Sequence, residues 1–151
     1  MGAINYKTSD FITLGYNTNN IDYEDQYYND LINDEYDEIK ILLDKEYFYY
    51  FHIVLKPGYY EGFTIDIEHN FSYCYDNYFE KLEALKEVTQ IKNFLLYIVN
   101  NFNINAVYPG WCTGYADYKK TIEEINAAIK EMKYTIKNTP TDYILRVRGE
   151  Y

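Results

Sequence analysis

The stretch that decides the fold is YFYYFHIVLKPGYYEGFTIDIE, residues 47–68. Residues 47–55 form a run of aromatic and β-branched side chains, which is typical of a β-strand. Pro57 and Gly58 follow, and proline before glycine suits the two central positions of a type II turn. Apolar and polar residues then alternate over 63–68, as in a strand with one buried and one solvated face. We therefore predict a hairpin of antiparallel strands around Pro57-Gly58.

Two long amphipathic helices are predicted after the hairpin. Asn77 and Glu80 have the spacing of a capping box, so the first helix is expected to span residues 77–102. The second is expected over residues 117–137, before Asn138 and Pro140 end it. The apolar stripes are Leu82, Leu85, Val88, Ile91, Leu95, Ile98 and Phe102 in the first helix, and Tyr118, Ile122, Ile125, Ile129, Met132 and Ile136 in the second. Such stripes pack on a sheet or on each other.

Three shorter stretches, residues 11–14, 71–75 and 143–151, are predicted as further strands. A length of 151 residues fits one compact domain, and a hydrophobic content of 48% excludes a disordered chain. The expected fold class is therefore a single α+β domain over residues 1–151: a small antiparallel sheet, two long helices and an acidic helical segment near the N-terminus.

The composition also limits the compartment and the cofactors. The chain has neither a secretory signal pattern nor an apolar run of the roughly 20 residues that cross a bilayer. Its two cysteines, Cys74 and Cys112, fit no zinc-type spacing and make a disulfide framework improbable. These observations predict a cytoplasmic protein without membrane contact, metal or other cofactor.

Negative charge is concentrated in one segment. The net charge of the whole chain is -10, and residues 20–46 hold ten acidic and two basic residues, which leaves only -2 for the remainder. Apolar residues recur at three- and four-residue intervals in this segment, so an amphipathic helix, in one piece or two, is expected over residues 21–46. Asp30, Asp34 and Glu38 would then stack at four-residue steps, which destabilises a helix by about 0.2–0.5 kcal/mol per pair.

An unfavourable arrangement of this kind invites a functional explanation. Carboxylates about 5–6 Å apart on successive turns present a regular row of negative charge, as a nucleic-acid strand does. We therefore predict a non-catalytic binding protein whose acidic face occupies the basic groove of a nucleic-acid-binding partner, a nuclease or another effector. The predicted partner-binding residues are Asp22, Glu24, Asp25, Tyr27, Asp30, Asp34, Tyr36, Asp37 and Glu38. The alternative is a solvated acidic helix that only keeps the protein soluble.

Two other groups of residues could form a metal, acid–base or ligand site. The residues that resemble metal ligands or acid–base groups are His52, Asp66, Glu68, His69 and Cys74. Asp66 and Glu68 share one face of a strand and His69 lies on the other, so the set does not converge and an exposed strand face is the better interpretation.

The loop of residues 108–115 holds Trp111, Cys112 and Tyr115. It could be a ligand pocket of a small enzyme or binding protein, but a structural plug over the core is favoured. Arg146 and Arg148, the only arginines, cannot make a nucleic-acid patch by themselves, so direct nucleic-acid binding is not expected.

The stretches INYKTSDFITLGYN (4–17), PGWCTGYADYKKTIEEINAAIKEMK (109–133) and KNTPT (137–141) resemble those of small acidic proteins carried by phages and mobile elements of low-GC Gram-positive bacteria. The resemblance covers both ends of the chain and carries no residue with an assigned chemical role. It implies a host-defence antagonist in the host cytoplasm, in the manner of anti-CRISPR and anti-restriction proteins that imitate nucleic acid. The present chain differs from such mimics in that its charge lies in one segment.

Overall fold

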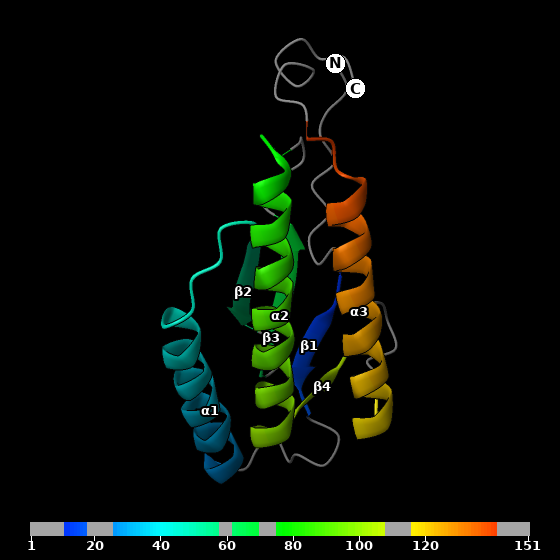
Figure 1. Ribbon diagram of the computed structural model, residues 1–151. Coiled ribbons are helices and arrows are strands. Elements are labelled where there is room, and N and C mark those ends of the chain that lie inside the picture. The colour runs from blue at the N-terminus through cyan, green and yellow to red at the C-terminus, as the bar shows by residue number, and fades with distance from the viewer. Residues whose placement is uncertain (1–10, 18–25, 58–61, 70–74, 108–115, 142–151) are drawn as a thin grey trace, which may run out of the picture.

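The computed structural model describes residues 11–17, 26–57, 62–69, 75–107 and 116–141, with backbone alone for 26–29. In chain order the elements are β1 (Thr13–Tyr16), α1 (Gln26–Asp44), β2 (Phe51–Pro57), β3 (Phe63–His69), α2 (Tyr78–Asn101), β4 (Ile104–Ala106) and α3 (Tyr118–Asn138). The strands form one antiparallel sheet in the order β2-β3-β1-β4. The helices lie on one side of this sheet, with α2 between α1 and α3 (Figure 1). This arrangement confirms the predicted α+β class.

The predicted hairpin is the β2–β3 pair. Its register runs from Phe51 opposite His69 to Pro57 opposite Phe63, and residues 58–61 lie outside the described parts. Proline closes β2 without disturbing the sheet because β2 is an edge strand, where a missing N–H is tolerated. Gly62 enters β3 with a φ of 91°, a conformation that glycine adopts without steric penalty. The strand begins at Phe51, four residues later than predicted, and this shift leaves Tyr47 and Tyr49 exposed ahead of it.

The two long helices begin where the sequence predicts. The Asn77 side chain accepts a hydrogen bond from the Glu80 N–H at 3.1 Å, and the Glu80 carboxylate accepts one from the Asp76 N–H. Asp117 caps α3 by accepting from the Lys120 N–H at 2.7 Å. These bonds satisfy backbone donors that have no partner within the first helical turn.

The predicted stripes are buried in the middle of each helix and reach solvent at the ends. Leu82 is 38% exposed and Tyr118 is 59% exposed, so placing them in the core was wrong. The Tyr118 hydroxyl instead donates to the Asn100 side chain at 2.7 Å. The fully buried core residues on α2 and α3 are Ala84, Val88, Ile91, Leu95, Ile98, Ile125, Met132 and Ile136. They pack against Leu14, Tyr16, Ile65 and Ile67 of the central strands.

The strand β4 is missing from the sequence prediction because three residues are too few to show a period. It is fixed by its neighbours: the Ala106 N–H donates to Thr121 Oγ1 at 3.1 Å, and the Ala116 N–H donates to the Ala106 carbonyl at 3.0 Å. The first strand lies at Thr13–Tyr16, two residues later than predicted. Of the other predicted strands, Tyr75 lies outside any strand, and residues 71–74 and 143–151 lie outside the described ranges.

Candidate partner-binding surface on helix α1

Helix α1 has one face on the core and one in solvent. The core face carries Ile32 and Ile39, which are 6% and 0% exposed. Tyr36 lies on this side as well: its half-buried ring meets Phe63 edge to face, with centroids 5.5 Å apart. The structure therefore places Tyr36, one of the predicted partner-binding residues, with the core stripe and apart from the solvent face. The predicted helix is confirmed as one continuous helix over Gln26–Asp44, and residues 21–25 of the prediction lie outside the described ranges.

The acidic residues of α1 are mostly on the solvent face. Within Gln26–Asp44 six acidic residues accompany one lysine, so the helix carries a net charge of -5. Asp30, Asp34, Asp37 and Glu38 are all exposed, and they form a contiguous group at three- and four-residue spacings. We call these four residues the acidic face. The other predicted members, Asp22, Glu24 and Asp25, lie outside the described ranges, and the side chain of Tyr27 is not described.

Glu35 is the acidic residue of α1 that turns inward. Burial raises the pKa of its carboxyl, and the charge of Glu38 adds to the rise; hydrogen bonds from the Asn103 backbone and the Tyr16 hydroxyl oppose it. Its Oε2 atom is buried and accepts no hydrogen bond from the parts of the chain that are described. Burial, followed by the charge of Glu35, likewise raises the pKa of Tyr16 to about 12. This polar contact attaches α1 to β1, and its sequence signal is only an acid on the apolar side of the helical period.

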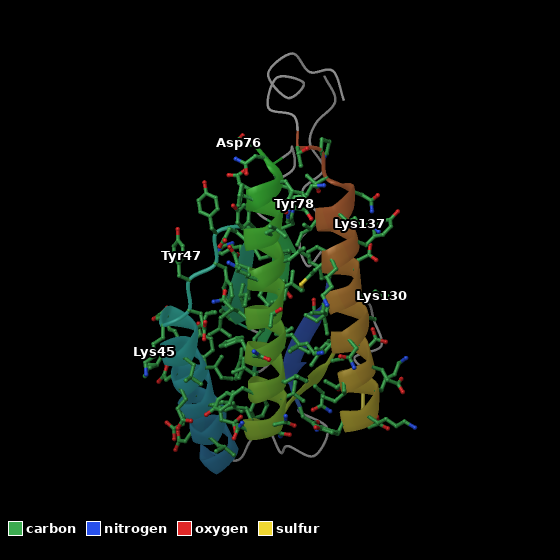
Figure 2. The ribbon with its side chains drawn as sticks, viewed as in Figure 1. Lys45, Tyr47, Asp76, Tyr78, Lys130 and Lys137 are labelled. Carbon is green, nitrogen blue, oxygen red and sulfur yellow. The ribbon has the colours of Figure 1, made fainter. Side chains whose placement is uncertain are left out.

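A groove runs between the C-terminal part of α1 and α2. Its volume is about 390 Å³, and its lining residues are Leu42, Lys45, Glu46, Gln90, Asn93, Phe94 and Tyr97. A second hollow of about 360 Å³ adjoins it at Gln90 and is lined by Tyr47, Tyr49, Tyr50, Glu83, Lys86 and Glu87. In Figure 2, Lys45 and Tyr47 stand at the left, at the end of α1 next to this surface. The sequence reasoning missed the groove; its signal was Phe94 and Tyr97, aromatic residues of α2 outside the predicted stripe.

One residue that lines the second hollow is a buried carboxylate. Glu87 of α2 is 9% exposed, and its Oε1 accepts the Tyr50 N–H at 2.9 Å. Burial raises the pKa of Glu87, while hydrogen bonds from the backbone of Tyr50, Tyr49 and Phe51 act against the rise. The role of Glu87 is thus structural, because it satisfies the donors at the entry to β2. Glu83 and Lys86 above it form an ion pair at 3.1 Å.

The acid and histidine set on the hairpin does not form a site. Asp66 is 5% exposed, so the prediction that its strand face is solvated is wrong at this position. Its carboxylate accepts from Thr13 Oγ1 and pairs with Lys56 Nζ, both at 2.9 Å. These bonds explain the burial, because both oxygens of the charged group have partners. His69 lies on the other strand face, where its Nε2 is 3.0 Å from the Tyr75 hydroxyl.

The remaining pair of this set, His52 and Glu68, is in weak contact only. His52 Nδ1 and Glu68 Oε2 are 4.0 Å apart, and His52 is largely exposed. Cys74 lies outside the described ranges, and among the residues within them no group of three histidine, cysteine or acidic side chains could hold a metal ion. The alternative ligand loop, Trp111, Cys112 and Tyr115, also lies outside these ranges.

Comparison of the chain with protein-family models, with curated proteins and with solved structures gave no match. No helix within the described residues is long and apolar enough to cross a membrane.

Proposed function

We propose that the protein acts by binding and not by catalysis, and that the acidic face of α1 occupies a basic, nucleic-acid-binding groove of another protein. One observation carries the proposal: four carboxylates stand together in solvent on the side of α1 opposite its core residues. Outside residues 20–46 the chain is nearly balanced, with a net charge of -2. A charge concentration on a rigid, docked helix can be matched by a complementary surface without ordering a flexible segment.

The expected kinetics follow from this charge distribution. Complementary potentials accelerate diffusional encounter, and the acceleration falls as salt shortens the Debye length to about 8 Å at physiological ionic strength. The partner would be a nuclease or effector whose nucleic acid is displaced. If the phage or mobile-element resemblance holds, that partner is a host defence protein and the place of action is the host cytoplasm.

The test compares two variants with the same change in net charge. The first reverses Asp34, Asp37 and Glu38 to Lys on α1, and the second reverses Glu123, Glu124 and Glu131 to Lys on α3. Proteins captured from a host lysate by the unmodified chain are identified by mass spectrometry, and their association rates are measured at low and high salt. A partner should bind the α3 variant nearly as tightly as the unmodified chain. It should bind the α1 variant at least tenfold more weakly, which is about 1.4 kcal/mol of binding free energy. Duplex DNA or RNA should release the partner from the unmodified chain.

The α1 variant should keep its fold, because it removes like-charge neighbours from a helix. Circular dichroism melting checks this point. Equal binding of the well-folded α1 variant and the unmodified chain would mean that the acidic face serves solubility alone, and the proposed function would be wrong.

A further inference from the structure

Three residues of the acidic face and one residue of the groove form one row on α1. Residues 30, 34, 38 and 42 follow one another at four-residue steps, and side chains at that spacing are neighbours along a helix. The first three are the exposed carboxylates Asp30, Asp34 and Glu38. The fourth, Leu42, lines the groove between α1 and α2 together with Lys45 and Glu46, which follow the last helical residue, Asp44. A partner that follows the carboxylates toward the C-terminus of α1 therefore arrives at the groove.

The groove differs from the row of acids in its chemistry. Its apolar side chains are Leu42, Phe94 and Tyr97, and Tyr97 is 50% exposed while Phe94 is 7% exposed. The two charged residues in the lining, Lys45 and Glu46, have opposite signs. Beyond Gln90 the surface stays aromatic, with Tyr47 at 78% and Tyr49 at 51% exposure. Exposed tyrosines around an apolar depression are the composition of a binding hot spot.

We propose that this groove is the anchor site for one large apolar side chain on a basic helical segment of the partner. The lysine or arginine residues of that segment, at four-residue steps, face Asp30, Asp34 and Glu38, and the next residue of its row enters the groove beside Leu42, Phe94 and Tyr97. The inference rests on the proposed function and deepens it, because it specifies the partner surface as cationic along most of its length and apolar at one end. Charges set the register and the rate of encounter, whereas burial of the anchor slows dissociation.

Synthetic peptides provide the probe. Two fluorescein-labelled helical peptides each carry three lysines at four-residue steps and one tryptophan at the next step. The tryptophan follows the lysines in one peptide and precedes them in the other. Matched peptides replace the tryptophan with serine or the lysines with glutamate. By fluorescence anisotropy, one tryptophan peptide should bind about tenfold or more tightly than its serine counterpart, as expected from partial burial of a large apolar side chain. The glutamate peptide should not bind.

A groove-filling variant tests the location. Asn93 is exposed and lines the groove on α2, so Asn93→Trp should fill it and reduce the tryptophan peptide to the affinity of the serine peptide. Asn126→Trp makes the same change at an exposed position of α3 and should leave binding unaltered. Thermal melting of both variants establishes that they are folded.

The outcomes separate this inference from the proposed function. Equal binding of the tryptophan peptide by Asn93→Trp and by the unmodified chain, equal binding of the tryptophan and serine peptides, or binding of neither would overturn the anchor site. If the Asp34, Asp37 and Glu38 to Lys variant keeps full affinity while Asn93→Trp loses it, the groove stands and the role of the acidic face fails. The reverse result retains the acidic face and removes the groove.

Discussion

Helices α1 and α3 flank α2 on opposite sides, and both are amphipathic, yet their charges are arranged in contrasting ways (Figures 1 and 2). On α3, five lysines accompany three glutamates, and Lys120 Nζ lies 3.2 Å from Glu124 and 3.9 Å from Glu123. Asp117 caps the start of α3, and Lys137 stands in its last turn, where a cation suits the helix dipole. The ion pairs, the cap and the position of Lys137 support the helix.

On α1 the same features are reversed or missing. Its carboxylates at Asp30, Asp34 and Glu38 repeat at the spacing of mutual repulsion, and its last turn holds Asp44 and no basic residue. The helix is held by Ile32, Ile39 and Tyr36 against the core and not by its own charges. The difference indicates that the solvent face of α3 is arranged for stability and that of α1 is arranged for something else.

The largest expected effect comes from removing a core side chain from either of the two helices. Ile125 on α3 and Ile39 on α1 are both 0% exposed, so replacing either with Ala should lower the unfolding free energy by about 2–5 kcal/mol. Urea unfolding measures the loss. Hydrogen exchange should then distinguish the helices: Ile125→Ala speeds exchange through α2 and α3, whereas Ile39→Ala speeds it most in α1. A loss below about 1 kcal/mol in Ile39→Ala would show that α1 is not docked as described.

The sequence predicts features that depend on residues close together in the chain and misses those that depend on distant residues. Asn77 and Glu80 act through near neighbours in the chain, so their spacing located the start of α2, and the local period of apolar residues located α3. By contrast, Asp66 is buried because Thr13, 53 residues away in the chain, binds it. Such long-range pairs leave no local pattern, so the alternation on β3 alone predicts a solvated face.

The same difference between local and long-range contacts applies to the candidate surface. The exposure of Asp34 and Glu38 could be predicted because the apolar stripe of the helix fixes which side meets the core. The inward turn of Glu35 could not, because it depends on Tyr16 and on Asn103, which lies between α2 and β4. The groove depends on how α1 stands relative to α2, and that arrangement is set by tertiary packing rather than by the period of either helix.

A smaller effect, defined by its sign, is expected at Glu35. Burial raises the pKa of this carboxyl above its ordinary value of 4.5, so the folded state binds the proton more strongly than the unfolded state. The resulting stability is fully present below pH 4.5 and is lost as pH rises through the folded pKa. Glu35→Gln should therefore be more stable than the unmodified chain at pH 7 and should lose less stability as pH rises from 4.5 to 7.

Chemical unfolding at several pH values measures this slope. A Glu46→Gln variant, which removes the same charge from an exposed position, controls for the loss of one negative charge. A Glu35→Gln variant that is less stable at pH 7 and keeps the pH slope of the unmodified chain would show that the carboxylate is well solvated in the folded state.

The smallest effect tests the comparison most directly, because one substitution should have opposite signs on the two helices. Glu38→Lys on α1 replaces a repulsive neighbour of Asp34 with an attractive one, and at about 0.2–0.5 kcal/mol per pair it should stabilise by roughly 0.5 kcal/mol. Glu124→Lys on α3 breaks the 3.2 Å pair with Lys120 and should destabilise by about the same amount. In a chain of this size each change corresponds to about 1–2 °C in Tm.

Both variants raise the net charge from -10 by the same amount, so a purely global effect of charge would shift both melting temperatures upward. Calorimetry at low salt should give shifts of opposite sign, and both should shrink at 1 M salt, where the Debye length is about 3 Å. Two shifts of the same sign would mean that the position of the carboxylates on α1 has no energetic consequence, and the contrast between the helices would then be one of composition alone.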